Sequence, residues 1–251
     1  MPLDEVTITR AILEEQLRVI LEHVELDVAV VGGGPSGLAC AALVSEKGRR
    51  CAVIEKKLSV GGGMWGGGMM FPRIVVQEKA RRLLDRFGIG YRKYADGYYV
   101  ASSVESVAKL TAAACDAGVE FFNLTSVEDV MIREDGRIQG LVINWTAVEM
   151  ARLHVDPLTI QAGVTVDATG HDAAVARLVE RKAGLVEVKG ERCMWAERAE
   201  DQVVHHTREI CPGLVVTGMA ANAVAGEHRM GPIFGGMLLS GERAAQIILN
   251  R

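Results

Sequence analysis

Blocks of apolar and polar positions along the chain predict alternating strands and helices. The clearest block runs from Asp27 to Lys56. An apolar, β-branched run (DVAVV) ends in glycines, helical spacing follows from Leu38, and a second apolar run ends at Glu55. Strand, glycine turn, helix and strand in this order are typical of a βαβ unit that binds a nucleotide.

The remaining pattern continues this alternation. Helical spacing predicts helices at 7–23, with Thr7 as a fair N-cap, at 77–87, at 103–117 and from 233 onward. Strands are predicted around a hairpin turn at Asp96-Gly97, on both sides of Asp135-Gly136 (the second through WTAVEM to residue 150), within 158–167 and at 211–218. Residues 181–206 show no clear pattern.

The order of these elements predicts the fold class. We expect an α/β fold, a doubly wound Rossmann-like sheet of the FAD/NAD(P)-binding type with a β-rich inserted layer. We expect residues 1–251 to form a single dinucleotide-binding domain, with an N-terminal helix and the β-rich insertion at about 88–155.

Composition and charge narrow the class of protein. The 251 residues are 49% hydrophobic and 24% charged with a net charge of −4, as in ordinary globular proteins. The chain has no basic stripe for nucleic acid, no apolar run of about 20 residues for a membrane span, and no secretory signal at its N-terminus. Five scattered cysteines without a C-x-x-C pair argue against a disulfide framework or a structural zinc, so we expect a cytoplasmic protein.

The glycine turn predicts a nucleotide site. In Gly32-x-Gly34-x-x-Gly37 the missing side chains let the backbone approach a pyrophosphate, and the next helix directs free N–H groups at it. Glu55 can accept hydrogen bonds from an adenosine ribose. The motif leaves open whether the nucleotide is FAD, a nicotinamide cofactor or a substrate. We expect the glycine-rich loop at 61–68 to wrap the ligand.

Two pairs of imidazole and carboxylate groups are candidates for metal binding. His154 and Asp156, the first pair, point to the same face of an extended segment. His171 and Asp172, the second pair, follow a predicted strand. Such ligands suit Fe(II), Mn(II) or Zn(II). A loop histidine bonded to backbone and a turn carboxylate before Pro157 are the alternatives. Arg229, before a glycine turn, can clamp a carboxylate or phosphate, the alternative being a surface salt bridge.

The combined motifs resemble those of the thiamine thiazole synthases, which make the ADP-thiazole precursor of thiamine. The matching segments follow the family order across nearly the whole chain: GGGPSGL (32–38), IEKK (54–57), GGGMWGGGM (61–69), SVEDV (126–130), NWTAVE (144–149), HVDP (154–157), ATGHD (168–172), GM (218–219) and RMGPIFGGMLLSG (229–241).

This resemblance implies a reaction in which NAD is a substrate. NAD loses nicotinamide, and its ADP-ribose part condenses with glycine and a sulfur source with the help of Fe(II). It implies that the ADP portion is held by Ser36, Glu55, Lys56, Gly63, Val127 and Met219. Glycine would be held by Arg229, Met230 and Gly231. Asp156 and His171 would ligate iron from neighbouring subunits, which implies a homo-oligomer, an octamer.

One departure from the fungal and plant members indicates the subtype. Those members carry, at the position of His154, a cysteine that gives up its own sulfur. Histidine has no sulfur to donate, so the chain resembles the archaeal type, which uses free sulfide and turns over repeatedly. His154 then becomes a candidate for the proton transfers of imine formation. A ribose-1,5-bisphosphate isomerase, a label also given to archaeal relatives, fits the intact iron and glycine motifs less well.

Two other classes share part of the pattern. An FAD-dependent oxidoreductase would have the same glycine turn, but its late strand commonly ends in Gly-Asp, whereas this one ends in Gly218-Met219. A thioether cannot replace the hydrogen bonds of that carboxylate. A non-catalytic nucleotide-binding module would not need the clusters at His154 and His171. We interpret His205-His206 as a solvated polar pair rather than a second metal site.

Overall fold

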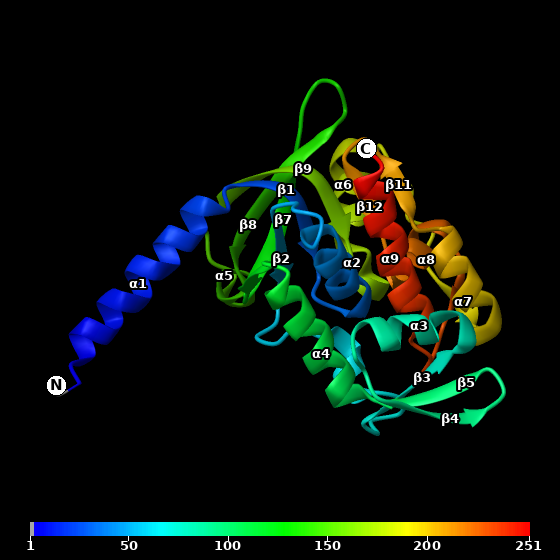
Figure 1. Cartoon of the computed structure of the whole chain (residues 1–251). Coiled ribbons are helices and arrows are strands. Elements are labelled where there is room, and N and C mark those ends of the chain that lie inside the picture. The colour runs from blue at the N-terminus through cyan, green and yellow to red at the C-terminus, as the bar shows by residue number, and fades with distance from the viewer. Residues whose placement is uncertain (1–2) are drawn as a thin grey trace.

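A mixed sheet forms the centre of the protein, as a computed structural model describes it for residues 3–251 (Figure 1). Its core is parallel: β1 (Glu25–Val31) lies between β2 (Cys51–Glu55) and β9 (Leu158–Asp167). Beyond β2 lies β6 (Glu120–Asn123). The first half of β9 pairs with β8 (Ile138–Trp145) and its second half with β12 (Leu214–Val216), so β9 joins two arms of the sheet.

The arms of the sheet end in antiparallel strands. One arm continues through β8 (Ile138–Trp145) to β7 (Thr125–Ile132), and the other through β12 (Leu214–Val216) to β11 (Arg208–Cys211). The predicted α/β class with a parallel, nucleotide-binding type of sheet is therefore confirmed.

Alternating residues of β1 supply both cores of the sheet. Val28 and Val30 pack on one side with α2 (Pro35–Ser45), α4 (Ser103–Asp116) and α9 (Gly235–Leu249). Ala29 and Val31 face the other side, which is covered by α6 (Ala174–Ala183) and the β7–β8 ribbon. Every residue of α2 is buried, so this first helix of the βαβ unit is held between the sheet and α9.

Smaller elements surround the sheet. A separate sheet has the order β3 (Arg73–Gln77), β5 (Tyr98–Ser102) and β4 (Tyr91–Ala95), and a short parallel pair joins β10 (Arg192–Met194) to β13 (His228–Arg229). The other helices are α3 (Glu78–Arg86), α5 (Thr146–Ala151), α7 (Ala196–His205), α8 (Met219–Ala225) and the 3₁₀ turns η1 (Gly62–Gly66) and η2 (Gly170–Asp172). The strands expected within 88–155 are thus distributed over two sheets.

Three local predictions were wrong. The strand predicted at 211–218 is divided: Cys211 ends β11, residues 212–213 form a turn, and β12 covers only Leu214–Val216. The strand predicted through WTAVEM ends at Trp145, and α5 begins at Thr146. The strand ends there because Trp145 pairs with Thr125, the first residue of β7, and no partner strand within residues 3–251 continues beyond it. At the N-terminus, Asp4 rather than Thr7 is the N-cap: its carboxylate accepts a hydrogen bond from the Thr7 amide (2.8 Å).

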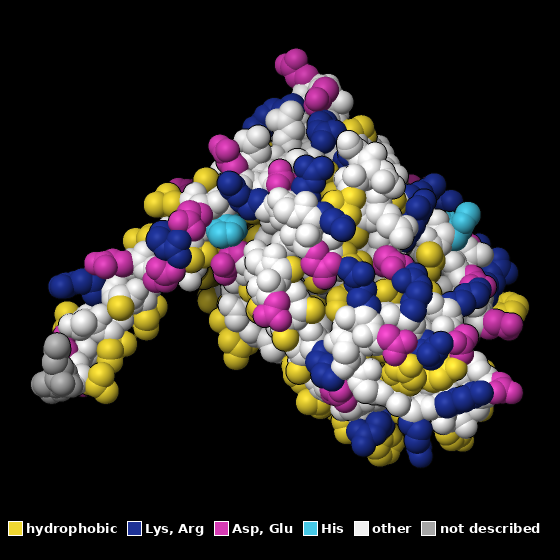
Figure 2. All heavy atoms as spheres, viewed as in Figure 1, with side chains coloured by type: hydrophobic (Ala, Val, Ile, Leu, Met, Phe, Trp, Pro, Cys, Tyr) yellow, Lys and Arg dark blue, Asp and Glu magenta, His cyan; other side chains and the backbone are white. Residues whose placement is uncertain are grey.

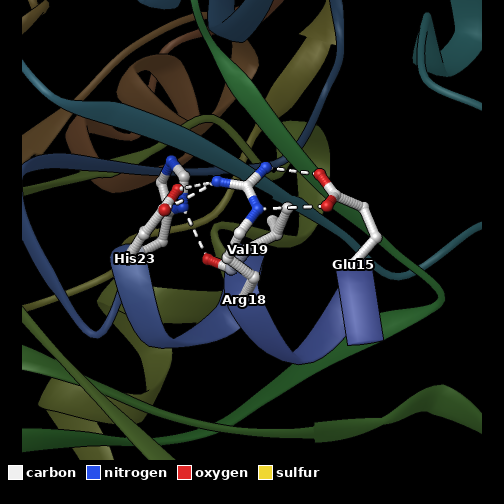
Figure 3. A network of polar contacts seen from close by, with 5 residues as sticks. Glu15, Arg18, Val19 and His23 are labelled. Atoms are coloured by element: carbon white, nitrogen blue, oxygen red, sulfur yellow. Dashed lines mark hydrogen bonds and ion pairs between the residues drawn. The ribbon is translucent and has the colours of Figure 1, made fainter. Parts of the chain in front are cut away.

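The N-terminal helix α1 (Glu5–Glu22) extends away from the body, and none of its residues is buried (Figure 1). Hydrophobic side chains lie along its length (Figure 2). On its polar side Arg18 donates to Glu15 (Nε–Oε2 3.0 Å) and to Glu22 (Nη1–Oε1 2.6 Å), beside His23 (Figure 3). Within residues 3–251, no helix is both long and apolar enough to cross a membrane.

Candidate functional site

A cavity of about 1130 Å³ opens at the carboxyl ends of the parallel strands. Here β1 lies between β2 and β9. The chain continues from β1 to β2 on one side and later returns to β9 on the other side. Open α/β sheets place their ligands at such a point. The glycine turn after β1, the end of β2 and the loop after β9 all contribute to the wall.

Most of the residues predicted from the sequence to form the site line this cavity. The side next to the glycine turn is lined by Gly32, Gly34, Ser36, Glu55, Lys56 and Gly63. It is also lined by Val127, His171, Met219, Arg229, Met230 and Gly231. Residues as far apart in the chain as Gly32 and Gly231 therefore face one space.

The three glycines of the turn have different structural roles. Gly32 has φ 100°, and a Cβ there would lie 2.5 Å from the carbonyl oxygen of Ala168. A Cβ at Gly37 would overlap the carbonyl of Gly32, so Gly37 allows α2 to pack on β1 and does not line the cavity. Gly34, the N-cap of α2, has open space around its Cβ position. Since no side chain caps α2, its N-terminal N–H groups are available to an anion.

Glu55 is a buried carboxylate that the backbone holds at the cavity wall. One oxygen accepts a hydrogen bond from the Gly33 amide (2.9 Å), and the other accepts one from the Lys57 amide (2.9 Å). Each carboxylate oxygen retains acceptor capacity for a ligand hydroxyl. The adjacent Lys56 is exposed, and its ammonium lies 3.9 Å from the carboxylate of Asp172.

The opposite wall is formed by the segment from Arg229 to Gly231. Asn222 donates to the carbonyl of His228 (3.0 Å), and the Trp195 amide donates to the carbonyl of Arg229 (3.0 Å). These bonds hold the backbone, while the Arg229 side chain is exposed and Met230 is buried. The Arg229 guanidinium, which has no hydrogen-bond or ion-pair partner among residues 3–251, thus lies beside an apolar thioether surface. This arrangement suits a small ligand with a carboxylate.

Glu200 anchors the helix that follows this segment. Its carboxylate accepts a hydrogen bond from the Gly236 amide in the first turn of α9 (2.7 Å) and another from the side chain of Gln77. Burial raises the pKa of Glu200 to about 7, against the effect of these two hydrogen bonds. A side chain at Gly235 would overlap Gln77, so the glycines at the start of α9 make room for this pair.

Asp167, at the end of β9, organises the loop that carries His171. Its carboxylate accepts hydrogen bonds from the Thr169 amide (3.0 Å), the Thr169 hydroxyl (2.7 Å) and the Ala176 amide (2.9 Å). It is fully buried, and this burial raises its pKa. His171 follows in η2, with Nδ1 2.8 Å from both carboxylate oxygens of Glu191.

His154 and Asp156 lie apart from this cavity. Both are exposed, in the segment between α5 and β9, where Asn144 donates to the carbonyl of Val155 (3.1 Å). No group of three or more histidine, cysteine, aspartate or glutamate residues within 3–251 could hold a metal ion. One chain thus presents His171 to the cavity without Asp156, and a metal site would need ligands from elsewhere.

Comparison with known proteins identifies the family. The profile of the Thi4 family matches residues 9–234. The chain belongs to the Thi4 family. It is 75% identical to the thiamine thiazole synthase of Methanoculleus marisnigri over 251 residues, covering 100% of this chain and 99% of that protein. It is 54% identical to that of Pyrococcus horikoshii over 249 residues, covering 99% of this chain and 98% of that protein.

A solved structure of the same family has nearly the same fold. The crystal structure of Thermovibrio ammonificans THI4 superposes with a TM-score of 0.97 at 48% identity, covering 100% of both chains. The predicted resemblance is confirmed, and with it a role as an enzyme of thiamine thiazole biosynthesis. Sequence reasoning missed Asp167, Glu191 and Glu200; only Asp167, a carboxylate at the end of a predicted strand, carried a local signal.

Proposed function

We propose that the chain converts NAD, glycine and sulfide into ADP-thiazole, releases nicotinamide, depends on Fe(II), and turns over repeatedly. The observation that carries this proposal is that a carboxylate suited to ribose, a free guanidinium and an imidazole all line one cavity, from Glu55, Arg229 and His171. A site that only binds a flavin or a nicotinamide cofactor would not need the guanidinium of Arg229 or the imidazole of His171.

The nucleotide side of the cavity suits the ADP part of NAD. The uncapped N-terminus of α2 can bind the pyrophosphate, with Gly34 leaving space for it. Glu55 is held in place by two backbone amides, so it can accept hydrogen bonds from ribose hydroxyls without losing side-chain freedom. The ribose that reacts would then lie toward Arg229 and His171.

The other side of the cavity suits glycine. Arg229 would bind its carboxylate through two N–H groups and leave its amine directed at the ribose carbon. The buried Met219 and Met230 would exclude water from the imine that forms between the glycine amine and the ribose carbon. Imine formation requires proton transfers, a role that we propose for His154 of a neighbouring copy, because His154 does not line the cavity of its own chain.

The metal and the oligomer belong together in this proposal. His171 would ligate Fe(II), and Asp156 would come from a neighbouring copy, because His154 and Asp156 do not line the cavity of their own chain. When bound, Fe(II) would supply a Lewis acid and a soft site for hydrosulfide. We therefore propose a homo-oligomer, an octamer, with each active site shared between subunits.

An experiment can test the reaction directly. Protein purified without oxygen is denatured, and the released small molecules are identified by mass spectrometry. The same protein is then assayed with NAD, glycine, sulfide and Fe(II) for repeated formation of ADP-thiazole and nicotinamide. Bound adenylated thiazole, or turnover beyond one equivalent, supports the proposal. Stoichiometric FAD, or no product with all four components, would overturn it.

Two variants separate the halves of the site. Glu55→Ala should weaken NAD binding at least about tenfold, because the ribose hydroxyls lose their acceptor. Arg229→Ala should bind NAD as wild type does and raise the KM for glycine. Glu197→Gln, an exposed position in the first turn of α7, serves as the control and should change neither quantity.

A further inference from the structure

A carboxylate contacts the candidate metal-binding histidine from a distant part of the chain. The Nδ1 atom of His171 lies 2.8 Å from both oxygens of Glu191. The side chain of His171 is 52% exposed, whereas that of Glu191 is 16% exposed, and both line the cavity. The carboxylate is therefore the more enclosed partner, and the imidazole is the more accessible one.

The contact determines the form of the histidine. A carboxylate only accepts hydrogen bonds, so the Nδ1 atom of His171 must carry the proton that it donates to Glu191. In the neutral ring the Nε2 atom then has a free lone pair. Histidines that ligate metals are commonly oriented in this way, by a hydrogen bond from the second nitrogen to a carboxylate.

The backbone holds both partners in place. Glu191 lies between two backbone donors: the Gly190 amide bonds the carbonyl of Ala223 (2.9 Å), and the Arg192 amide bonds that of Glu227 (2.9 Å). On the other side, the buried carboxylate of Asp167 holds the turn that leads into η2. The carboxylate and the imidazole thus meet between two fixed loops rather than as mobile surface side chains.

The neighbouring charges leave this pairing undisturbed. The carboxylate of the adjacent Asp172 lies 3.9 Å from the ammonium of Lys56. Arg177 donates to the carbonyl of Asp172 (3.1 Å) rather than to Glu191. Within residues 3–251, Glu191 is the one carboxylate at hydrogen-bond distance from His171.

We propose that Glu191 is a positioning residue of the metal site, which holds His171 with its proton on Nδ1 and its Nε2 directed at a divalent cation in the cavity. This inference rests on the proposed function, in which His171 binds Fe(II). It adds a residue outside the motifs that identify the family in the sequence. Two other roles make different predictions: a structural ion pair without a ligand, or Glu191 itself as a metal ligand.

The first measurement uses the metal-free full-length protein. With ¹⁵N-labelled histidine at alkaline pH, long-range ¹H–¹⁵N correlations report which nitrogen of His171 carries the proton. The assignment comes from His171→Ala. We expect the Nδ1–H form in wild type and a shift toward Nε2–H in Glu191→Ala. A wild-type ring protonated at Nε2 would overturn the proposal.

The second measurement is the dissociation constant for Fe(II), or for Co(II) as a spectroscopic substitute, without oxygen. Glu191→Ala should weaken binding about 10- to 100-fold, and Glu191→Gln, which keeps an acceptor oxygen, should fall between it and wild type. Glu197→Gln should bind as wild type does. Unchanged affinity in Glu191→Ala would overturn the proposal. So would a loss as complete as that of His171→Ala, which would make Glu191 a ligand.

The two proposals fail in different ways. If wild type binds no divalent cation with NAD and glycine present, the Fe(II)-dependent function fails and the positioning role fails with it. If wild type binds the cation and Glu191→Ala binds it equally well, only the role of Glu191 fails. Should Glu191→Ala unfold, two readouts remain: the tautomer of His171 in wild type, and the weaker Fe(II) binding expected of Glu191→Gln.

Discussion

The buried carboxyl of Glu200 makes the stability of this protein depend on pH. It accepts hydrogen bonds from the Gly236 amide (2.7 Å) and from Gln77. Burial raises its pKa from 4.5 to about 7, and the neighbouring Asp201 adds to this rise. Its Oε1 atom is buried and has no hydrogen-bond partner among the described residues. An ionised Glu200 is therefore poorly compensated in the folded protein.

The sign of the effect follows from proton binding. The folded protein binds this proton more tightly than the unfolded chain, so Glu200 contributes its full stability below about pH 4.5. That contribution is lost as the pH rises to about 7 and stays lost above it. Since one pKa unit corresponds to about 1.4 kcal/mol, the whole loss is about 3.5 kcal/mol, of which about 2.5 kcal/mol falls between pH 5 and pH 8.

Glu200→Gln removes this proton equilibrium and keeps an oxygen for the Gly236 amide. We expect the variant's free energy of unfolding, measured in urea, to gain about 2.5 kcal/mol relative to wild type between pH 5 and pH 8. Groups common to both proteins cancel in this difference. Glu197→Gln on the same helix is the control and should show no such trend. A difference between Glu200→Gln and wild type that stays constant with pH would refute the reasoning.

Further substitutions test the loop after β9 and the glycine turn. Asp167→Asn should lower the free energy of unfolding by about 2 to 3 kcal/mol in urea, because its amide nitrogen would face the buried N–H of Ala176; wild-type stability would contradict this. Gly37→Ala should be largely unfolded before heating, as measured by thermal unfolding, because the added methyl group would overlap the carbonyl of Gly32. Gly34→Ala should melt near wild type but bind NAD about tenfold more weakly by calorimetry; equal melting temperatures for the two glycine variants would refute the distinction between them.

Local patterns predicted the centre of the fold well. The predicted strand, turn, helix and strand between Asp27 and Lys56 correspond to β1, α2 and β2, because composition, turn residues and periodicity all agree there. Prediction was poorer where pairing with another strand determines where a strand ends. The segment WTAVEM contains residues suited to a strand, but β8 ends when β7 ends opposite it at Thr125, and the chain enters a helix.

The site was predictable as far as its residues belonged to recognisable motifs. Six residues of the first motifs and the segment from Arg229 to Gly231 were found in this way and line the cavity; the six are Gly32, Gly34, Ser36, Glu55, Lys56 and Gly63. Glu191 was not found, because it lies beside β10, a three-residue strand that exists through pairing with β13 near residue 228. Glu200 was missed for a similar reason: its partners Gln77 and Gly236 lie far away in the chain.

The cavity draws its walls from positions between Val31 and Met237, and this spread determines when it can form as the chain folds. The central pairing joins β1, at residues 25–31, to β9, at residues 158–167, and such distant pairings form slowly. During synthesis the glycine turn therefore exists long before the site does. A ligand that binds in this cavity can stabilise only the completed chain, so it would act late and stabilise the finished fold rather than its first steps.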